Sequence, residues 1–368
     1  MVSAAGRRKI EPDAPLSLFP SRQVWTLALN SQITVPPAFD RERAYFGVAG
    51  DRLVCYRLLD GTQEWLVSAQ ALTQSAVGDV LIFTPEPGAL VARRIADGSI
   101  AWELPLRDTL AVPPVWDVGW LVAATTEGSI LAFRGTDGQL IWRHEIGSPA
   151  HAAPTLAADR VYVPTQDGRV VALHVETGEP AWEQRLGGEV NDVLALDDRV
   201  YAGSKDNFLY CLLTKNGRID WRWRTGGDVI GLPAVDNHRV YFVSLDNVLR
   251  ALDRISGAQQ WMRPLSVRPV WGPLVAVDRL IVGGQSPSLQ GYLLKDGTPA
   301  GTLDVNDELA AAPHLLDDSV APIPTALIVT RQLATGAAAR LVTRRLEPDS
   351  STLEAPLPNV ISMTAKTP

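Results

Sequence analysis

The sequence predicts an all-β protein folded as an eight-bladed β-propeller, and three observations lead to this fold class. A five-residue segment ending in tryptophan occurs as GTQEW at 61–65 and again as GSIAW, GQLIW, GEPAW, GRIDW and GAQQW. The spacing of these segments is close to forty residues, which is the signature of a repeat architecture. Each unit also contains four short apolar segments separated by Asp, Asn and Gly turns, a pattern typical of β-strands.

The repeat continues beyond the six complete copies at both ends. Trp25 stands one period before Trp65 without the glycine, and Gly301 stands one period after Trp261. We expect each tryptophan to lie on the outer strand of a blade, flat against the glycine turn of the next blade, with its N–H bonded to a backbone acceptor. These docking residues are Trp25, Trp65, Trp102, Trp142, Trp182, Trp221 and Trp261.

Radial repetition of four-stranded antiparallel units makes a propeller. Proline cannot donate a backbone hydrogen bond, so the prolines of the first strands predict that these strands line a central channel with one free edge. They are Pro37, Pro114, Pro154, Pro233, Pro273 and Pro313.

The last blade is less regular than the others. Its inner strands are expected near 310–316, 325–331 and 339–346, and its outer strand is expected to be the N-terminal segment 22–29. This pairing would close the ring and remove two open strand edges. The tail segment 352–357 is an alternative for the same place.

The chain therefore divides into three parts. Residues 1–20 are expected to form a flexible N-terminal segment, residues 21–346 the propeller, and residues 347–368 a C-terminal tail.

Composition excludes several classes of partner. The net charge is −7 and the Lys and Arg residues are scattered, which argues against a nucleic-acid surface. No run of apolar residues is long enough to span a membrane, and the N-terminus lacks the apolar segment of a signal peptide. We therefore expect either a cytosolic protein or a processed mature form.

The two cysteines, Cys55 and Cys211, occupy a repeat position that is otherwise Ala or Gly, so we expect them to be packed and too far apart for a disulfide. His144 and His151 share a segment but have no further ligands at zinc-site spacing. Hydrolase and phosphate-binding motifs are also missing from the sequence. We expect no catalytic residue, no cofactor and no metal ion.

The repeat resembles the tryptophan-docking motif of the pyrroloquinoline-quinone (PQQ) propellers. Ala251, Asp253, Ser256, Gly257 and Trp261 match its pattern of small residue, Asp, Ser, Gly and Trp. The resemblance covers about residues 21–346. The other copies keep the glycine and, except at Gly301, the tryptophan, but they replace the Asp by Arg57, Arg94, Arg134, His174, Leu213 or Leu293.

Two subfamilies share this repeat. The quinoprotein alcohol dehydrogenases are longer and carry a vicinal cysteine disulfide, Ca²⁺ ligands and a catalytic Asp; this chain has no adjacent cysteines. The chain is more similar to BamB, the lipoprotein of the outer-membrane β-barrel assembly machinery, in its length, its N-terminal Trp strand and a seventh blade without Trp.

The resemblance to BamB implies a non-enzymatic interaction scaffold in the periplasm, as a monomer within a complex whose partner is the barrel-forming subunit. In that family the partner binds the loops after the third and fourth blades. Here these loops are 144–151 and 185–192, and we expect His151, Glu189 and Asp192 near the centre of the contact. The first loop lacks the Leu-x-Leu-Arg contact sequence. The alternative is a PQQ-dependent or other redox enzyme, or a ligand-binding propeller, that uses the central funnel.

Overall fold

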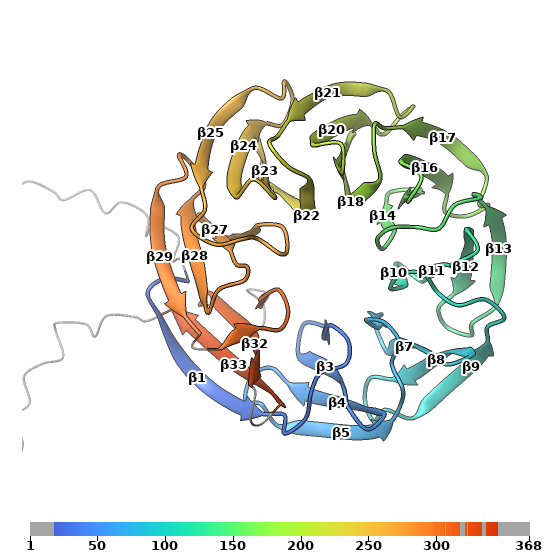
Figure 1. The fold of residues 1–368 in the computed structure, drawn as a ribbon. Coiled ribbons are helices and arrows are strands. Elements are labelled where there is room, and N and C mark those ends of the chain that lie inside the picture. Colours follow the sequence, from blue (N-terminus) through green and yellow to red (C-terminus); the bar gives the residue numbers. More distant parts are fainter. Residues whose placement is uncertain (1–17, 306, 317–320, 322, 333–335, 345–368) are drawn as a thin grey trace, which may run out of the picture.

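The computed structural model describes residues 18–305, 307–316, 321, 323–332 and 336–344, and all of their regular elements are β-strands. Eight sheets surround a central channel and form a closed ring (Figure 1). In seven sheets the four strands follow one another in chain order, and the eighth sheet combines the two ends of the described chain. The predicted eight-bladed β-propeller is confirmed.

Each of the first seven blades runs from an inner strand at the channel to an outer strand at the rim. Blades 1 to 4 comprise β2 (Ala38–Phe39), β3 (Arg43–Val48), β4 (Arg52–Arg57), β5 (Gln63–Ser68); β6 (Ala76–Val77), β7 (Leu81–Glu86), β8 (Ala89–Arg94), β9 (Ile100–Pro105); β10 (Val115–Asp117), β11 (Trp120–Ala124), β12 (Ser129–Arg134), β13 (Leu140–Glu145); β14 (Thr155–Ala157), β15 (Arg160–Pro164), β16 (Arg169–His174) and β17 (Pro180–Arg185).

Blades 5 to 8 follow in the same order, with β1 added to the last blade. They comprise β18 (Val190–Leu196), β19 (Arg199–Ser204), β20 (Phe208–Leu213), β21 (Ile219–Arg224); β22 (Val229–Val235), β23 (Arg239–Ser244), β24 (Val248–Asp253), β25 (Gln259–Pro264); β26 (Leu274–Ala276), β27 (Arg279–Val282), β28 (Ser288–Leu293), β29 (Pro299–Asp304); β30 (Glu308–Leu309), β31 (His314–Leu315), β32 (Thr325–Gln332), β33 (Gly336–Arg344) and β1 (Ser21–Ala28).

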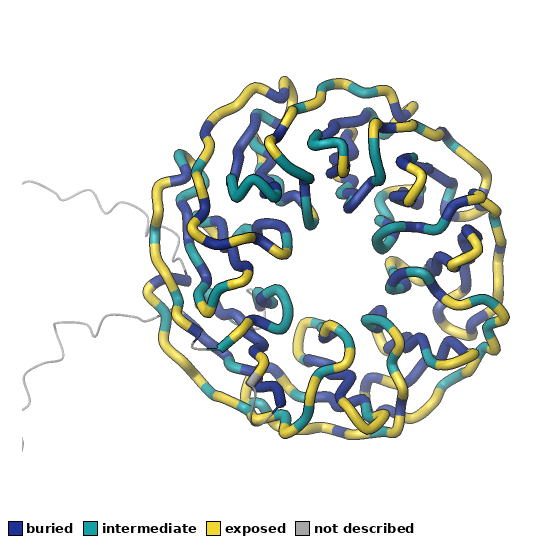
Figure 2. The backbone as a smooth tube through the Cα atoms, in the orientation of Figure 1, coloured by how far each residue is buried: buried dark blue, intermediate teal, exposed yellow. Residues whose placement is uncertain are grey.

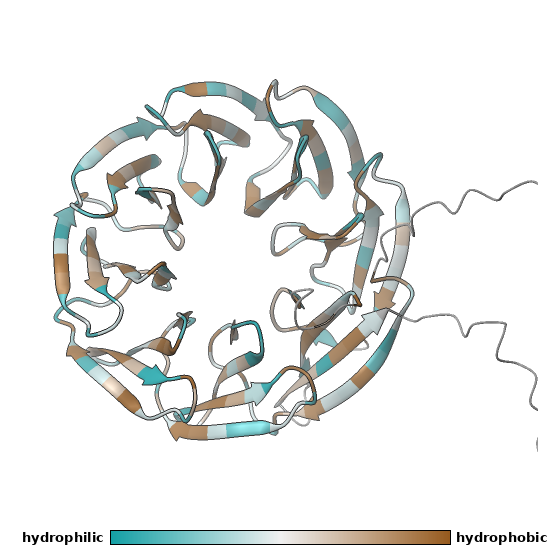
Figure 3. Ribbon diagram, turned by 180° about the vertical axis from the view of Figure 1, so that it is seen from behind, coloured by the Kyte–Doolittle hydropathy of each residue, from teal (hydrophilic) through white to brown (hydrophobic). Residues whose placement is uncertain are grey.

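The middle strands carry the core of the protein. Strands such as β11 and β12 are buried along almost their whole length, because both faces of a middle strand pack against neighbouring blades. Outer strands such as β13 bury only some of their residues (Figure 2). Seen from behind, hydrophobic residues concentrate on the strands inside the rim (Figure 3). The core is therefore a series of apolar layers between blades.

The ring closes through the N-terminal strand. β1 pairs antiparallel with β33, from Ser21 opposite Arg344 to Ala28 opposite Ala338. This confirms that the segment predicted at 22–29 is the outer strand of the last blade. The competing segment, 352–357, lies outside the described residues.

The N-terminal boundary needs a correction. Leu18 and Phe19 were predicted to belong to a flexible segment, yet they are 1% and 2% exposed and pack in the apolar layer between blades 7 and 8. A Cβ atom on Gly301 would lie 2.6 Å from the Phe19 Cβ. Phe19 therefore fills the space that a tryptophan at position 301 would fill in a regular blade. The rest of the predicted segment, residues 1–17, lies outside the described residues.

The tryptophans dock as one repeated contact between blades. A Cβ on the partner glycine would meet the indole ring, as at Gly217, where it would lie 2.4 Å from Trp182 Cε3. Six of the seven indole N–H groups donate to a carbonyl oxygen of the next blade: Trp25 to Leu58 (3.1 Å), Trp65 to Ile95 (2.7 Å), Trp102 to Gly135 (3.1 Å), Trp142 to Val175 (2.7 Å), Trp182 to Thr214 (2.7 Å) and Trp261 to Leu294 (3.0 Å).

Trp221 is the exception in this series. Its ring lies against Gly257 as the repeat requires, but its buried Nε1 has no hydrogen-bond partner among the described residues. The Arg254 carbonyl, which stands at the corresponding position in the next blade, accepts a hydrogen bond from the Tyr201 hydroxyl at 3.3 Å. This dock therefore depends on ring packing without the polar contact.

The cysteines lie in β4 and β20, in blades 1 and 5, and both are fully buried. Cys55 pairs with Trp65 across the blade and Cys211 pairs with Trp221, just as Ala132 pairs with Trp142. Burial raises the pKa of each thiol to about 12. Each cysteine acts as a small residue beneath a docked indole.

Candidate binding site in the central channel

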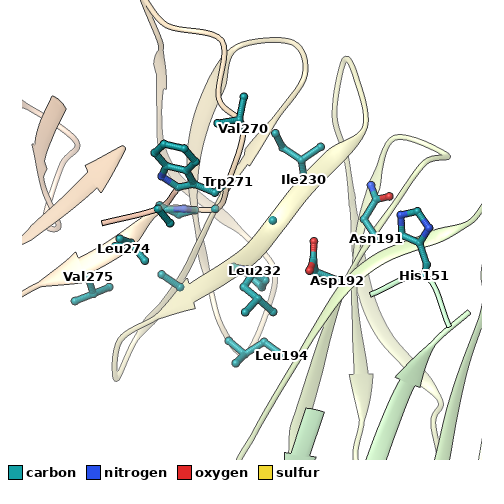
Figure 4. A pocket seen from close by; sticks show the side chains of 16 residues that line it. His151, Asn191, Asp192, Leu194, Ile230, Leu232, Val270, Trp271, Leu274 and Val275 are labelled. Atoms are coloured by element: carbon teal, nitrogen blue, oxygen red, sulfur yellow. The ribbon is translucent and has the colours of Figure 1, made fainter. Parts of the chain in front are cut away.

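A cavity of about 710 Å³ opens beside the central channel, where the inner strands of blades 5, 6 and 7 meet (Figure 4). Its volume is within the range of small-molecule binding pockets. The lining residues are His151, Asn191, Asp192, Leu194, Ile230, Gly231, Leu232, Pro233, Ala234, Val270, Trp271, Gly272, Pro273, Leu274, Val275 and Ala312.

One side of the cavity is polar. His151, Asn191 and Asp192 lie together there, and Asn191 Nδ2 donates to the Val229 carbonyl oxygen at 2.6 Å (Figure 4). This bond ties inner strand β18 to inner strand β22. The Asn191 amide therefore has a structural partner, whereas the neighbouring carboxylate is directed to the cavity.

The Asp192 carboxyl is partly buried and forms no ion pair within the described residues. Burial raises its pKa to about 6, and a hydrogen bond from the Gly231 backbone opposes this shift. At neutral pH the group is therefore mainly an anion, held at a cavity wall without a compensating cation.

Glu189 has a different environment three residues earlier. His151 Nδ1 lies 2.5 Å from one of its carboxylate oxygens, and Lys205 Nζ contacts the other. Two of the predicted partner-binding residues, His151 and Glu189, thus contact one another, and Asp192 shares the cavity wall with His151. The charge of Glu189 is compensated by Lys205, but that of Asp192 is not.

The other side of the cavity is apolar and comes from blades 6 and 7. Leu232 and Val270 are 51% and 47% exposed, although both belong to the inner wall of the ring. Apolar side chains left open around a cavity are typical of binding sites. The sequence prediction did not include this side, which also contains Ile230 and Trp271.

The two histidines that share a segment in the sequence, His144 and His151, lie apart in the structure. His144 lies on outer strand β13 and His151 lines the channel cavity, so they belong to different surfaces. Within the described residues, no group of three or more His, Cys, Asp or Glu side chains is arranged to hold a metal ion. The same part of the chain contains no helix with the length and apolar character needed to span a membrane.

Eight radial sheets, with a tryptophan docked on a glycine turn at seven of the interfaces, define the protein as a PQQ-like β-propeller. The family model described as outer membrane protein assembly factor BamB matches residues 17–112, 107–195 and 185–322. The chain belongs to this family. A comparison with curated proteins gave no match.

Solved structures of three kinds resemble the chain. BamB from Moraxella catarrhalis is 18% identical with a TM-score of 0.70, over 87% of this chain and 97% of the other. The computationally designed Ika8 protein is 14% identical with a TM-score of 0.71, over 88% and 99%. Quinohemoprotein alcohol dehydrogenase from Comamonas testosteroni is 12% identical with a TM-score of 0.70, over 90% and 78%. Likeness at these identities reflects the shared fold, which serves unrelated functions.

Proposed function

We propose that the protein is a non-enzymatic interaction scaffold of the cell envelope, which assists the assembly of outer-membrane β-barrel proteins from the periplasmic side. The observation that carries this proposal is the BamB family match across residues 17–322. A rigid ring of blades holds its connecting loops in fixed positions, and such loops are suited to binding a protein partner.

The proposed partner is the barrel-forming subunit of the assembly machinery, and the proposed contact is the rim formed by loops 144–151 and 185–192. Three features support this place. Glu189 and His151 supply polar groups, Asp192 supplies an uncompensated charge, and the nearby Leu232 and Val270 supply exposed apolar surface. A polar rim around an apolar centre is the usual anatomy of a protein interface.

The alternative, a quinone-dependent dehydrogenase, has the structural match to the quinohemoprotein alcohol dehydrogenases in its favour. The residues of this chain do not fit that chemistry. Cys55 and Cys211 belong to blades 1 and 5 and cannot form a vicinal disulfide. The cavity contains a single carboxylate, Asp192, where Ca²⁺ would require several oxygen ligands. The scaffold role is therefore favoured.

Capture from outer-membrane extracts tests the scaffold role. The tagged protein should retain the barrel-forming subunit, identified by mass spectrometry. Reversing two charges with Glu189→Lys and Asp192→Lys should reduce this capture at least about tenfold, because removal of interfacial charge complementarity weakens such complexes by that order. The matched control is Glu176→Lys with Glu179→Lys, two exposed residues in the turn before β17, at the opposite end of β17 from loop 185–192.

The melting temperatures decide how a loss of capture is interpreted. The control variant should melt within about 2 °C of the parent protein, since substitutions at exposed residues cost little stability. A loss of capture by the Glu189 and Asp192 variant counts for the proposal only if that variant still melts in a single cooperative transition above the assay temperature. Undiminished capture by the Glu189 and Asp192 variant would place the partner site elsewhere. Titration with PQQ and Ca²⁺, followed by visible absorbance, tests the alternative, and saturable binding would favour the enzyme.

A further inference from the structure

In six of the eight blades a backbone bridge near the start of the inner strand joins it, or the segment leading into it, to the second strand. The bridged pairs are Ile33 with Val48, Leu110 with Thr125, Ala150 with Thr165, Val190 with Ser204, Val229 with Ser244 and Pro269 with Gly284. The residue two places after the bridge can be compared between these blades, with blade 5 having one residue fewer than blade 6 before the strand pairing resumes. These residues are Val35, Val112, Ala152, Asp192, Gly231 and Trp271.

Blades 5, 6 and 7 differ at this residue from blades 1, 3 and 4, which have Val or Ala. Asp192 is charged, Trp271 is the largest side chain in the set, and Gly231 between them has no side chain. These departures meet at one place, because all three residues line the 710 Å³ cavity. Blade packing alone does not require them, since blades 1, 3 and 4 are built with Val or Ala at the same position.

Gly231 adapts the backbone to this arrangement. Its φ angle is +66°, and a Cβ atom there would lie 2.0 Å from the Gly272 nitrogen. The segment that carries Trp271 can therefore approach inner strand β22 only because residue 231 is glycine. The cavity is thus formed by a specific set of substitutions in three successive blades.

The chemistry of the two walls defines the ligand. Asp192 and Trp271 lie on opposite sides of the cavity, with Ile230 and Leu232 between them (Figure 4). An anion would be repelled by Asp192. A neutral apolar molecule would bury the carboxylate without a partner, which is costly. A cation would pair with the carboxylate and could also be stabilised by an aromatic face.

We infer that this cavity is a binding site for a small organic cation, an amine or amidine whose charged group pairs with Asp192 and whose apolar body contacts Trp271, Ile230 and Leu232. The site shares Asp192 and Leu232 with the proposed partner contact, but ligand binding is measured without a protein partner. Loss of partner capture therefore does not contradict the ligand site, and absence of ligand binding does not contradict the scaffold role.

Isothermal titration of the full-length protein with three probes of one shape tests this site. The probes are phenethylammonium, the neutral 2-phenylethanol and the anion phenylacetate, used near neutral pH. Phenethylammonium should bind at least about tenfold more tightly than 2-phenylethanol, because only the cation compensates the negative charge of the Asp192 carboxylate. Phenylacetate should show no saturable binding.

Two Asp→Asn variants test whether the Asp192 carboxylate is the group that recognises the cation. Asp192→Asn preserves the shape of the side chain and should abolish the preference for the cation while leaving the affinity for 2-phenylethanol within about twofold. Asp117→Asn makes the same change at an exposed residue of β10 outside the cavity and should keep the preference. Leu232→Ser should weaken the binding of both the cation and the alcohol, since it removes an apolar contact with the body of each probe.

The outcomes against the proposal are equally definite. Absence of saturable phenethylammonium binding to the parent protein overturns it, whatever the variants do. Equal affinities of the parent protein for phenethylammonium and 2-phenylethanol would show that the Asp192 carboxylate does not recognise the charge. An Asp192→Asn variant that still binds the cation more tightly than the alcohol would show the same. Melting curves of each variant exclude misfolding as the cause of any loss.

Discussion

The outer rim and the inner wall of the propeller follow different rules. At the rim, an aromatic ring docks on a glycine turn in each of seven interfaces, and six of these docks add the same hydrogen bond. On the inner wall, the residue two places after the bridge is Val or Ala in blades 1, 3 and 4, but Asp192, Gly231 and Trp271 in blades 5, 6 and 7. The repeated rim contacts therefore stabilise the ring, whereas the candidate binding site lies where the inner-wall residues differ between blades.

The reason is that the two regions face different neighbours. A rim tryptophan packs against the neighbouring blade, which is another copy of the same repeat, so the same tryptophan–glycine contact can be used at successive interfaces. An inner residue that lines the cavity is partly open to the channel, so neighbouring blades constrain its size and charge less than they constrain a rim tryptophan. Selection for a ligand or partner can therefore act on the inner wall without weakening the ring.

The largest effect should come from removing a docked indole at the middle of the ring. Trp142→Ala or Trp182→Ala should lower the free energy of unfolding by about 3–5 kcal/mol, through lost burial and a cavity between blades. Thermal or denaturant unfolding measures this cost. Leu140→Ala on the same outer strand as Trp142, at a residue 47% exposed, is the control and should cost less than about 0.5 kcal/mol. Equal costs at the two positions would contradict the docking role.

The interface between blades 7 and 8, which has no docking tryptophan, extends the comparison, since its aromatic ring comes from a distant part of the chain. Phe19→Ala should lower the free energy of unfolding by about 3 kcal/mol, because it empties the space at Gly301 between blades 7 and 8. Val24→Ala, on the adjacent strand at a residue 49% exposed, should have little effect. An unchanged melting temperature in the Phe19 variant would mean that this segment is not needed for ring closure.

On the inner wall, removal of the Asp192 charge should increase the free energy of unfolding of the protein. The pKa of Asp192 is raised to about 6 in the folded protein, so the unfolded chain loses this proton first and stability falls as the pH rises from about 4 to about 6. Asp192→Asn should therefore raise the free energy of unfolding by about 1–2 kcal/mol at pH 8, a value reduced to allow for the partial exposure of the carboxyl. At pH 4 the substitution should leave the free energy of unfolding unchanged. Denaturant titrations at both pH values measure the difference, and a gain independent of pH would exclude the charge as its cause.

The smallest effect on stability should distinguish the Trp182 and Trp221 docks, whose sequences are alike but whose indole hydrogen bonds differ. Trp182→Phe loses a hydrogen bond to the Thr214 carbonyl, whereas Trp221→Phe loses none, because the Trp221 N–H has no partner within the described residues. The Trp182 variant should therefore be less stable than the Trp221 variant by about 1 kcal/mol. Paired denaturant curves resolve such a difference, and a reversed order would show that ring packing dominates both docks.

Much of this architecture could be predicted because the information is repeated. A tryptophan every forty residues indicates the unit, its turns and prolines indicate the strand order, and Trp25 indicates how the ring closes. His151, Glu189 and Asp192 were also placed on one rim by family likeness, and the first two contact each other in the structure. The contact between Phe19 and Gly301 could not be predicted in this way, because Phe19 occurs once and outside the period.

The sequence by itself thus determined the fold, the number of blades and the rim docks, since these depend on local periods that every copy restates. Only the tertiary structure decided which inner residues share a cavity. Asp192 and Trp271 are separated by two blade lengths in the chain, and they meet because closure of the ring brings successive inner strands to one channel. The charge state of Asp192 was decided there too, because it depends on burial by the surrounding strands and not on the residue type.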